Sequence, residues 1–112
     1  MAAASDRRAA WGRWRLGLAL AAACGAASAA EAPKAPPKAV QCAACHGPNG
    51  IGTGPAFPNL AGQKADYLVK ALRDFRSGKR QDEVMSVMAK GLTSEEIDEL
   101  AQYYEALGQQ PK

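Results

Sequence analysis

Apolar side chains recur at helical spacing in three segments of the second half of the chain. The first segment, residues 64–77, places one apolar stripe along a helix, and Gly78 ends the pattern. The second segment, residues 82–90, is shorter, with Asp82 as its N-cap and Gly91 as its C-terminal stop. The first stripe consists of Tyr67, Leu68, Ala71, Leu72 and Phe75, and the second of Val84, Met85 and Met88.

The third segment opens with Thr93-Ser94-Glu95-Glu96, which fits a capping box between Thr93 and Glu96. We expect this helix to end at Gly108. Its apolar face consists of Ile97, Leu100, Ala101, Tyr104 and Leu107. No segment shows the alternating period of a strand and the chain has no internal repeat, so the sequence predicts an all-α fold.

A short helix and a long loop precede these segments. Residues 38–45 can form about two helical turns, because Pro37 can begin a helix but cannot lie inside one. Residues 47–59 are dense in Gly and Pro and predict a loop. Short helices beside a long loop leave few apolar residues for a tight bundle, which suggests that something apolar fills the centre.

The first thirty residues have the layout of a secretory signal peptide. Basic residues are followed by an apolar run at 16–23, and residues 27–29 form a plausible A-x-A cleavage site. The run is too short to span a bilayer as a helix, although an uncleaved anchor is an alternative. Cleavage at Cys24 with attachment of a lipid is a second alternative. We therefore expect residues 1–30 to be removed on export to the periplasm.

Export changes the charge of the protein. The first thirty residues hold four arginines and one aspartate, which accounts for the whole formal charge of +3. The remaining residues carry ten basic and ten acidic side chains, so the mature chain is close to neutral and nucleic-acid binding is not expected. Residues 31–38 are rich in Pro and Ala and predict a linker, and residues 39–110 predict the single domain.

The stretch "QCAACHG" at residues 41–47 holds two of the three cysteines and the only histidine. A structural zinc site would need a fourth ligand, and adjacent Cys45 and His46 could hardly share one tetrahedral ion. A thioredoxin-like redox pair would need a βαβ scaffold, of which the sequence gives no sign. A disulfide would close a tiny loop and add little stability.

Cys-x-x-Cys-His is also the attachment motif of covalent haem. In that chemistry Cys42 and Cys45 each form a thioether with a haem vinyl group, and His46 binds the iron. The export signal and the lone histidine favour this interpretation over the other three. Because no second histidine is present, the sixth iron ligand would be a methionine, Met85 or Met88, unless both fill the core.

Residues 41–107 resemble the class I c-type cytochromes, in particular short bacterial cytochromes similar to cytochrome c553 and single domains of cytochrome c4. The resemblance is carried by the segments "CAACHGPNGIGTGPAFPNLAGQ", "YLVKALRDFRSGKR" and "MSVMAKGLTSEEIDELAQYY". It implies a cytochrome c fold around one covalently bound haem c. The sequence departs from the family pattern in one region. Pro33, Pro36 and Pro37 shorten the first helix, so we expect its crossing with residues 103–104 to be weaker.

The resemblance implies a role for each matching position. Pro58 would accept a hydrogen bond from the iron-bound imidazole, and Met85, with Met88 as the fallback, would be the distal ligand. Tyr67 would pack in the pocket, and Arg80 would approach a haem propionate unless it is a solvated surface charge. The implied haem-binding residues are Cys42, Cys45, His46, Pro58, Tyr67, Arg80 and Met85, of which His46 and Met85 would ligate the iron.

We therefore expect a soluble periplasmic electron carrier and not an enzyme. The haem iron would cycle between Fe(II) and Fe(III), and the protein would dock as a monomer on partners such as a membrane oxidase or a periplasmic reductase. Three alternatives stay open. They are a haem subunit held in a larger redox complex, a haem protein in which Met85 dissociates so that the iron binds small molecules, and a non-haem thiol-redox protein.

Overall fold

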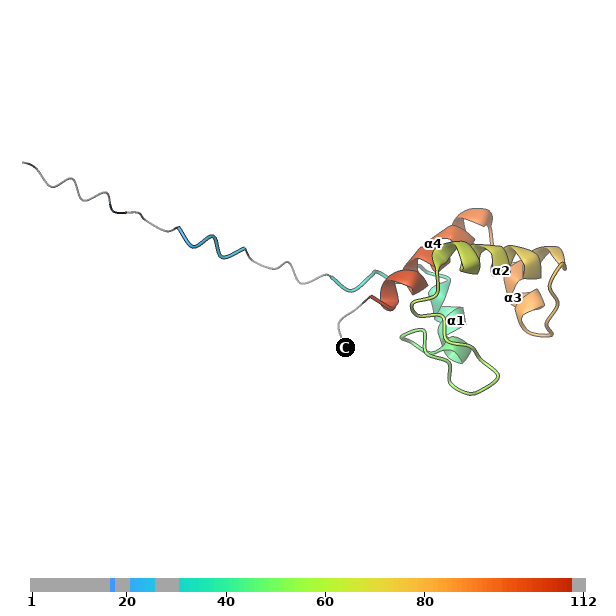
Figure 1. The fold of residues 1–112 in the computed structure, drawn as a ribbon. Helices are drawn as coiled ribbons and strands as arrows, with labels where there is room; N and C mark the ends of the chain where they lie inside the picture. The colour runs from blue at the N-terminus through green and yellow to red at the C-terminus, as the bar shows by residue number, and fades with distance from the viewer. Residues whose placement is uncertain (1–16, 18–20, 26–30, 110–112) are drawn as a thin grey trace, which may run out of the picture.

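Four helices make up the fold of the computed structural model, which describes residues 17, 21–25 and 31–109 (Figure 1). They are α1 (Ala39–His46), α2 (Ala65–Ser77), α3 (Met85–Lys90) and α4 (Ser94–Leu107). No strand occurs in the described part of the chain, so the all-α prediction is confirmed. The predicted cleavage site at residues 27–29 lies outside the described residues. Among the helices that are described, none combines the length and apolarity needed to cross a membrane.

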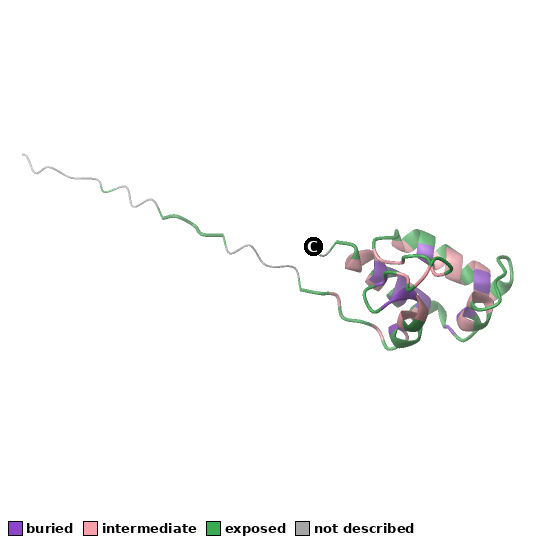
Figure 2. Cartoon of the chain, turned by 90° about the horizontal axis from the view of Figure 1, so that it is seen from below, coloured by how far each residue is buried: buried purple, intermediate pink, exposed green. Residues whose placement is uncertain are grey.

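The core lies where α2 packs against α4 (Figure 2). Helix α4 contributes most of it, and its side chains Ile97 and Leu100 are 0% and 2% exposed. Helix α1 adds only Ala39, and α2 adds Leu68. The whole cluster consists of Ala39, Leu68, Leu92, Ile97, Leu100, Ala101 and Tyr104. The buried face predicted for the last helix is therefore confirmed, with Leu107 partly buried at its end.

The apolar stripe predicted for α2 is narrower than expected. Leu68 and Phe75 are buried, but Tyr67 is 52% exposed. Successive residues lie about 100° apart around a helix, so Tyr67 points away from the direction in which Leu68 enters the core. Tyr67, which the sequence placed in this stripe, is therefore not part of the core. Gly78 ends α2 in the left-handed conformation, with φ +84°, as predicted.

Helix α3 begins three residues later than the sequence predicted. Asp82 was expected to be its N-cap, but the helix begins at Met85. The capping chemistry is nevertheless present, because Asp82 Oδ1 accepts hydrogen bonds from the backbone N–H groups of Val84 and Met85. The prediction was wrong about the boundary because an aspartate can cap a turn that precedes a helix as well as the helix itself.

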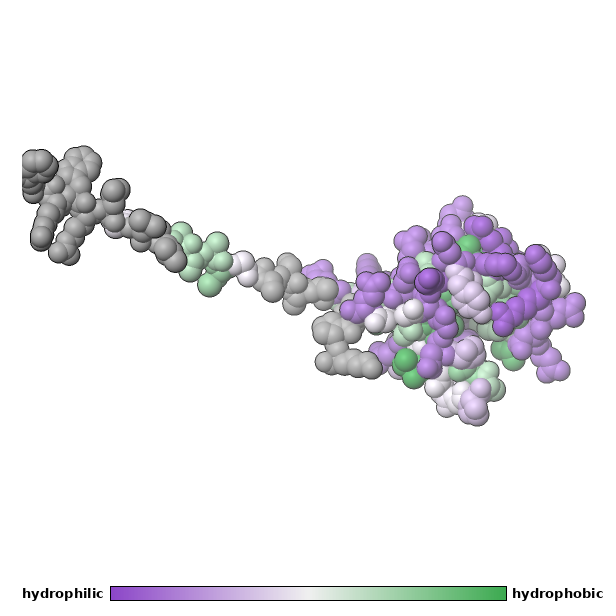
Figure 3. All heavy atoms as spheres, in the orientation of Figure 1, coloured by the Kyte–Doolittle hydropathy of each residue, from purple (hydrophilic) through white to green (hydrophobic). Residues whose placement is uncertain are grey.

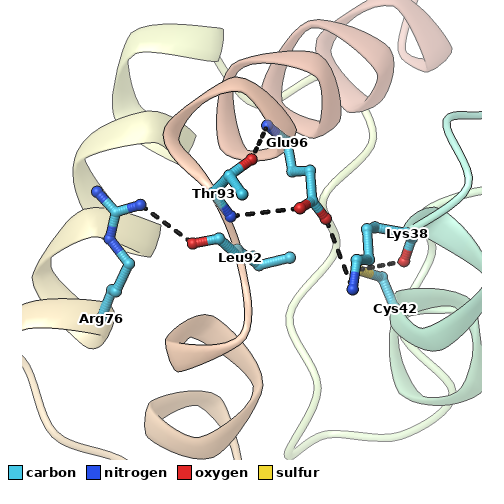
Figure 4. A network of polar contacts seen from close by, with 6 residues as sticks. All are labelled: Lys38, Cys42, Arg76, Leu92, Thr93 and Glu96. Atoms are coloured by element: carbon cyan, nitrogen blue, oxygen red, sulfur yellow. Dashed lines mark hydrogen bonds and ion pairs between the residues drawn. The ribbon is translucent and has the colours of Figure 1, made fainter.

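The capping box of α4 forms as predicted (Figure 4). Thr93 Oγ1 accepts from the backbone N–H of Glu96 at 3.1 Å, and Glu96 Oε1 accepts from the N–H of Thr93 at 3.4 Å. The other carboxylate oxygen of Glu96 lies 3.6 Å from Lys38 Nζ. Arg76 Nη1 donates to the carbonyl oxygen of Leu92 at 3.1 Å. These contacts join the start of α1, the end of α2 and the turn before α4.

The proline segment before α1 lies beside α4. An open groove of about 460 Å³ is lined by residues 33–37 on one side and by Glu99, Gln102 and Tyr103 on the other. Ala39 is 5% exposed and belongs to the same buried cluster as Tyr104. The short α1 therefore still reaches the segment around Tyr103 and Tyr104 through its first residue.

Two glycines end helices for different reasons. Gly91 and Gly108 both have right-handed φ values, −82° and −72°, so neither is required for a left-handed turn. A Cβ atom on Gly91 would have only one neighbour, Met88 O at 3.9 Å. A Cβ atom on Gly108 would collide with the backbone of Gly62, whose N–H donates to the carbonyl oxygen of Tyr104. Gly108 is needed for close approach of the loop to α4.

The two glycines supply a matched pair of variants. We expect Gly108→Ala to lower the free energy of unfolding by about 1–3 kcal/mol, because the added methyl group overpacks a backbone contact. Gly91→Ala should change it by less than about 1 kcal/mol, and in the stabilising direction, because its φ suits alanine. Guanidinium unfolding followed by far-UV circular dichroism measures both. Equal effects of the two substitutions would contradict the close-approach explanation.

Candidate functional site

Helix α1 presents both cysteines of the motif on one face. Cys42 and Cys45 are three residues apart, the spacing at which helical side chains lie on the same side. Both are half-buried free thiols. His46 is the last residue of α1 and is 6% exposed. Gly47 follows with φ +80°, which lets the chain turn sharply away from the helix directly after the histidine.

The imidazole of His46 is held by one hydrogen bond. Its Nδ1 lies 2.8 Å from the carbonyl oxygen of Pro58, and a carbonyl oxygen can only accept. Nδ1 therefore carries a proton, and in the neutral form of the ring Nε2 keeps its lone pair. A neutral imidazole with Nδ1 bonded to a carbonyl is a typical arrangement for a metal-ligating histidine. The resemblance to c-type cytochromes implied this bond, and Phe57 lies edge-on to the ring, with centroids 6.4 Å apart.

The loop that carries Pro58 is tied to itself and to α1. The carbonyl oxygen of Gly50 accepts from the N–H groups of Leu60 and Ala61 at 2.7 and 3.0 Å. Asn59 Oδ1 accepts from the N–H of Gly52 at 2.8 Å. The N–H and Oγ1 of Thr53 both donate to the carbonyl oxygen of Cys45, at 3.1 and 3.0 Å. The position of the Pro58 carbonyl is thus fixed relative to the helix that carries His46.

Sequence reasoning missed Thr53 and Asn59 as residues that position the site. The Gly- and Pro-rich composition predicted a loop there, but composition does not show which side chains close it. A weak signal was available, because Asn and Thr commonly bond to backbone groups within turns.

Cys42 has two polar neighbours. Its Sγ lies 3.5 Å from the carbonyl oxygen of Lys38, to which the S–H donates, and the hydroxyl of Tyr104 is a second hydrogen-bond partner. Burial raises the pKa of the Cys42 thiol, and the Tyr104 hydrogen bond opposes this shift. The thiol is therefore in its protonated form at neutral pH. Burial also raises the pKa of Tyr104 above its ordinary value of 10.0.

The remaining residues implied by the resemblance lie on other elements. Met85 and Met88 are both half-buried on α3. Arg80 is exposed, with its guanidinium carbon 4.6 Å from the ring centroid of Phe75. The structure therefore brings together His46 and Pro58, whereas Arg80 lies on an aromatic ring of α2 and Tyr67 is half exposed. In Figure 1, α1 and α3 extend from the same side of α2.

The fold leaves an unusual set of large apolar side chains open to solvent. All of them lie on α1, α2, α3 or the segments that join these helices, and α4 contributes none. The face seen in Figure 3 is mainly hydrophilic, with hydrophobic residues at a few places. These residues are Val40 (79% exposed), Ile51 (55%), Tyr67 (52%), Val84 (51%) and Val87 (68%). The exposed large apolar side chains thus lie on the elements that carry the cysteines, the histidine and the methionines, or on the segments next to them.

The available donor atoms also fit haem better than a bare ion. Within the described residues, no group of three or more His, Cys, Asp or Glu side chains could hold a metal ion. The described residues offer one oriented imidazole and two thioethers, those of Met85 and Met88. An iron that brings ring nitrogens of its own needs only axial ligands of this kind.

Comparison with known proteins gives one family. The family model described as cytochrome c matches residues 25–107. A thiosulfate dehydrogenase electron acceptor of Thiomonas intermedia is 47% identical over 74 residues, covering 65% of this chain and 34% of the relative. Cytochrome c-554(548) of Halomonas halodenitrificans is 43% identical over 70 residues, covering 60% of this chain and 84% of the relative.

A solved structure supports the same fold. The reduced cytochrome c4 of Pseudomonas stutzeri matches with a TM-score of 0.56 and 40% identity, over 58% of this chain and 37% of that chain. The present chain thus spans about a third of the length of several relatives, namely the electron acceptor and the c4 proteins, and most of the length of cytochrome c-554(548).

The raised pKa of Tyr104 predicts a loss of stability at alkaline pH. A group whose pKa is higher in the folded state contributes fully below its unfolded value, here 10.0, and the contribution is lost as the pH rises towards the folded value. Above pH 10, the free energy of unfolding of the wild type should therefore fall by up to about 1.4 kcal/mol per pH unit more than that of Tyr104→Phe. Guanidinium unfolding at several pH values measures this difference.

Tyr67 provides the control for that experiment. Its side chain is 52% exposed, so Tyr67→Phe removes a phenol without removing a buried one. If Tyr104→Phe and the wild type lose stability at the same rate, burial of the Tyr104 phenol does not govern the alkaline limit.

Proposed function

Because the chain belongs to the cytochrome c family, we propose that it is a periplasmic one-electron carrier. Cys42 and Cys45 would hold one haem c through thioether bonds, and His46 and Met85 would ligate its iron. When bound, the haem supplies one-electron Fe(II)/Fe(III) chemistry. The observation that carries the proposal is the 2.8 Å hydrogen bond between His46 Nδ1 and the Pro58 carbonyl oxygen, which leaves Nε2 free for a metal.

The protein residues have separate tasks in this function. The Pro58 carbonyl fixes the plane of the His46 ring and makes Nε2 a stronger donor. Met85 supplies a thioether, and His/Met ligation favours a higher reduction potential than other common ligand sets. With His46 and Met85 both bound, the iron would have no position open for substrate. This arrangement suits electron transfer and not catalysis.

The partner class follows from the relatives. Two of them, from Thiomonas intermedia and Stutzerimonas stutzeri, are named thiosulfate dehydrogenase electron acceptors. We propose that this chain accepts electrons from a periplasmic oxidoreductase and passes them to a membrane oxidase, binding each briefly as a monomer. Because the mature chain is close to neutral, its net charge gives no long-range attraction to a partner protein. Local charged patches then guide the association.

The length of the relatives favours a second role, that of a haem subunit in a larger redox complex. This chain covers 34% of the Thiomonas electron acceptor and 32% of cytochrome c4 of Thiocapsa roseopersicina. A single haem domain of this size could serve as one subunit of a larger redox complex. Size-exclusion chromatography of native periplasmic material separates the two roles, since a free carrier elutes as a small monomer.

Haem attachment can be tested on the exported protein. We expect the intact mass to equal the cleaved chain plus one haem, and the reduced protein to give a low-spin visible spectrum that carbon monoxide does not change. A protein with both Cys42→Ala and Cys45→Ala should carry no covalent haem. A mature wild-type mass without haem would overturn the proposed function.

The distal ligand can be identified by two matched substitutions. Met85→Leu removes the proposed thioether ligand and should give a high-spin or rearranged iron, seen in the visible and electron paramagnetic resonance spectra. Met88→Leu keeps a similar volume three residues further along α3 and should leave the low-spin spectrum intact. The opposite pattern would move the ligand to Met88.

A further inference from the structure

Helix α3 begins at the proposed iron ligand, and it is only six residues long. The first four N–H groups of any helix lack partners within it. In α3 the first two, on Met85 and Ser86, pair with Asp82 Oδ1 at 2.8 Å and with the carbonyl oxygen of Asp82 at 3.1 Å. The next two pair with the carbonyl oxygen of Val84 at 3.1 and 3.0 Å. Asp82 therefore satisfies the N–H of Met85 itself.

Asp82 and Ser86 are also joined in the reverse direction. The N–H of Asp82 donates to Ser86 Oγ at 3.0 Å, and the N–H of Val84 donates to Asp82 Oδ1 at 2.9 Å. We call four bonds together the Asp82–Ser86 clasp. Two join the backbone N–H of each of Asp82 and Ser86 to an oxygen of the other residue, and two join the N–H groups of Val84 and Met85 to Asp82 Oδ1. The hydrogen bonds from Met85 and Val84 lower the pKa of Asp82, so the carboxylate is charged and the bonds are charge-assisted.

Burial fixes the loop before α3 only weakly, although α3 itself packs against α2. Residues 79–84 are all exposed, and the first fully buried side chain is Ala89, one turn beyond Met85. On the other side the chain is anchored at Arg80, whose N–H donates to the carbonyl oxygen of Asp74 at 3.0 Å. Between these two anchors the backbone of Met85 is fixed by the clasp.

We propose that Asp82 is a positioning residue for Met85, and that the Asp82–Ser86 clasp keeps the Met85 thioether on the haem iron. The proposal rests on the proposed function, since it assumes haem with Met85 as distal ligand. Its physical basis is entropic. A ligand on a fixed backbone loses less freedom when it binds than one on a mobile loop. Breaking the clasp therefore favours any external ligand that competes with Met85.

Competition by imidazole on the ferric, haem-loaded protein measures this effect. Asp82→Ala removes the two hydrogen bonds that Asp82 Oδ1 accepts, from the N–H groups of Val84 and Met85, and should raise the affinity for imidazole about fivefold, the change expected for loss of one capping side chain. Asp82→Asn keeps an acceptor oxygen and should change it by less than about twofold. Ser86→Ala breaks only the return bond and should give a rise of about twofold.

Glu83→Ala is the matched control. It removes the same charge one residue away from Asp82, and Glu83 is exposed. Its imidazole affinity should equal that of the wild type. If Glu83→Ala raises the affinity for imidazole as much as Asp82→Ala does, the effect is due to local charge, and the proposed role of the clasp is overturned. If Asp82→Ala leaves the affinity unchanged, the clasp is overturned as well.

The wild-type spectrum keeps this test separate from the proposed function. A ferric wild type that shows the charge-transfer band of an iron–thioether bond has the proposed ligand, and the variants then decide on the clasp alone. A wild type without this band overturns the ligand assignment of the proposed function, and with it the clasp. Should Asp82→Ala fail to accumulate, Ser86→Ala decides, and an unchanged affinity in that variant overturns the clasp.

Discussion

A single hydrogen bond, from His46 Nδ1 to the carbonyl oxygen of Pro58, sets the chemistry of the candidate site. It determines which imidazole nitrogen carries the proton and in which plane the ring lies. The bond requires the loop after α1 to return to the helix, and it does so through Thr53 and Asn59. A Cβ atom on Gly50 would lie 2.9 Å from the backbone nitrogen of Ala61 and 3.1 Å from Tyr104 Cδ1, so this part of the loop requires a glycine. Much of the loop thus serves to place one carbonyl oxygen.

The helices provide a frame around that site and not a complete core. Helices α2 and α4 pack together, while α1 contributes only Ala39 to the buried cluster. Small domains commonly need a staple beyond their own apolar side chains, and a covalently attached haem is such a staple.

Local chemistry could be predicted from the sequence, and contacts between distant segments could not. The attachment motif and the capping box of Thr93 and Glu96 depend on neighbouring residues and were predicted. The resemblance to class I c-type cytochromes, the all-α fold and one covalent haem c are confirmed by the family match. The exposure of Tyr67, the closeness of Gly108 to Gly62 and the loop bonds of Thr53 and Asn59 depend on tertiary packing, which no local pattern encodes.

The central claim is that the iron is bound by one imidazole and one thioether of this chain. X-ray absorption at the iron K-edge of the haem-loaded protein measures it most directly, in both oxidation states. We expect a six-coordinate iron with one sulfur neighbour and otherwise nitrogen neighbours, the same in Fe(III) and Fe(II). An iron without a sulfur neighbour, or one that loses it on reduction, would contradict the account.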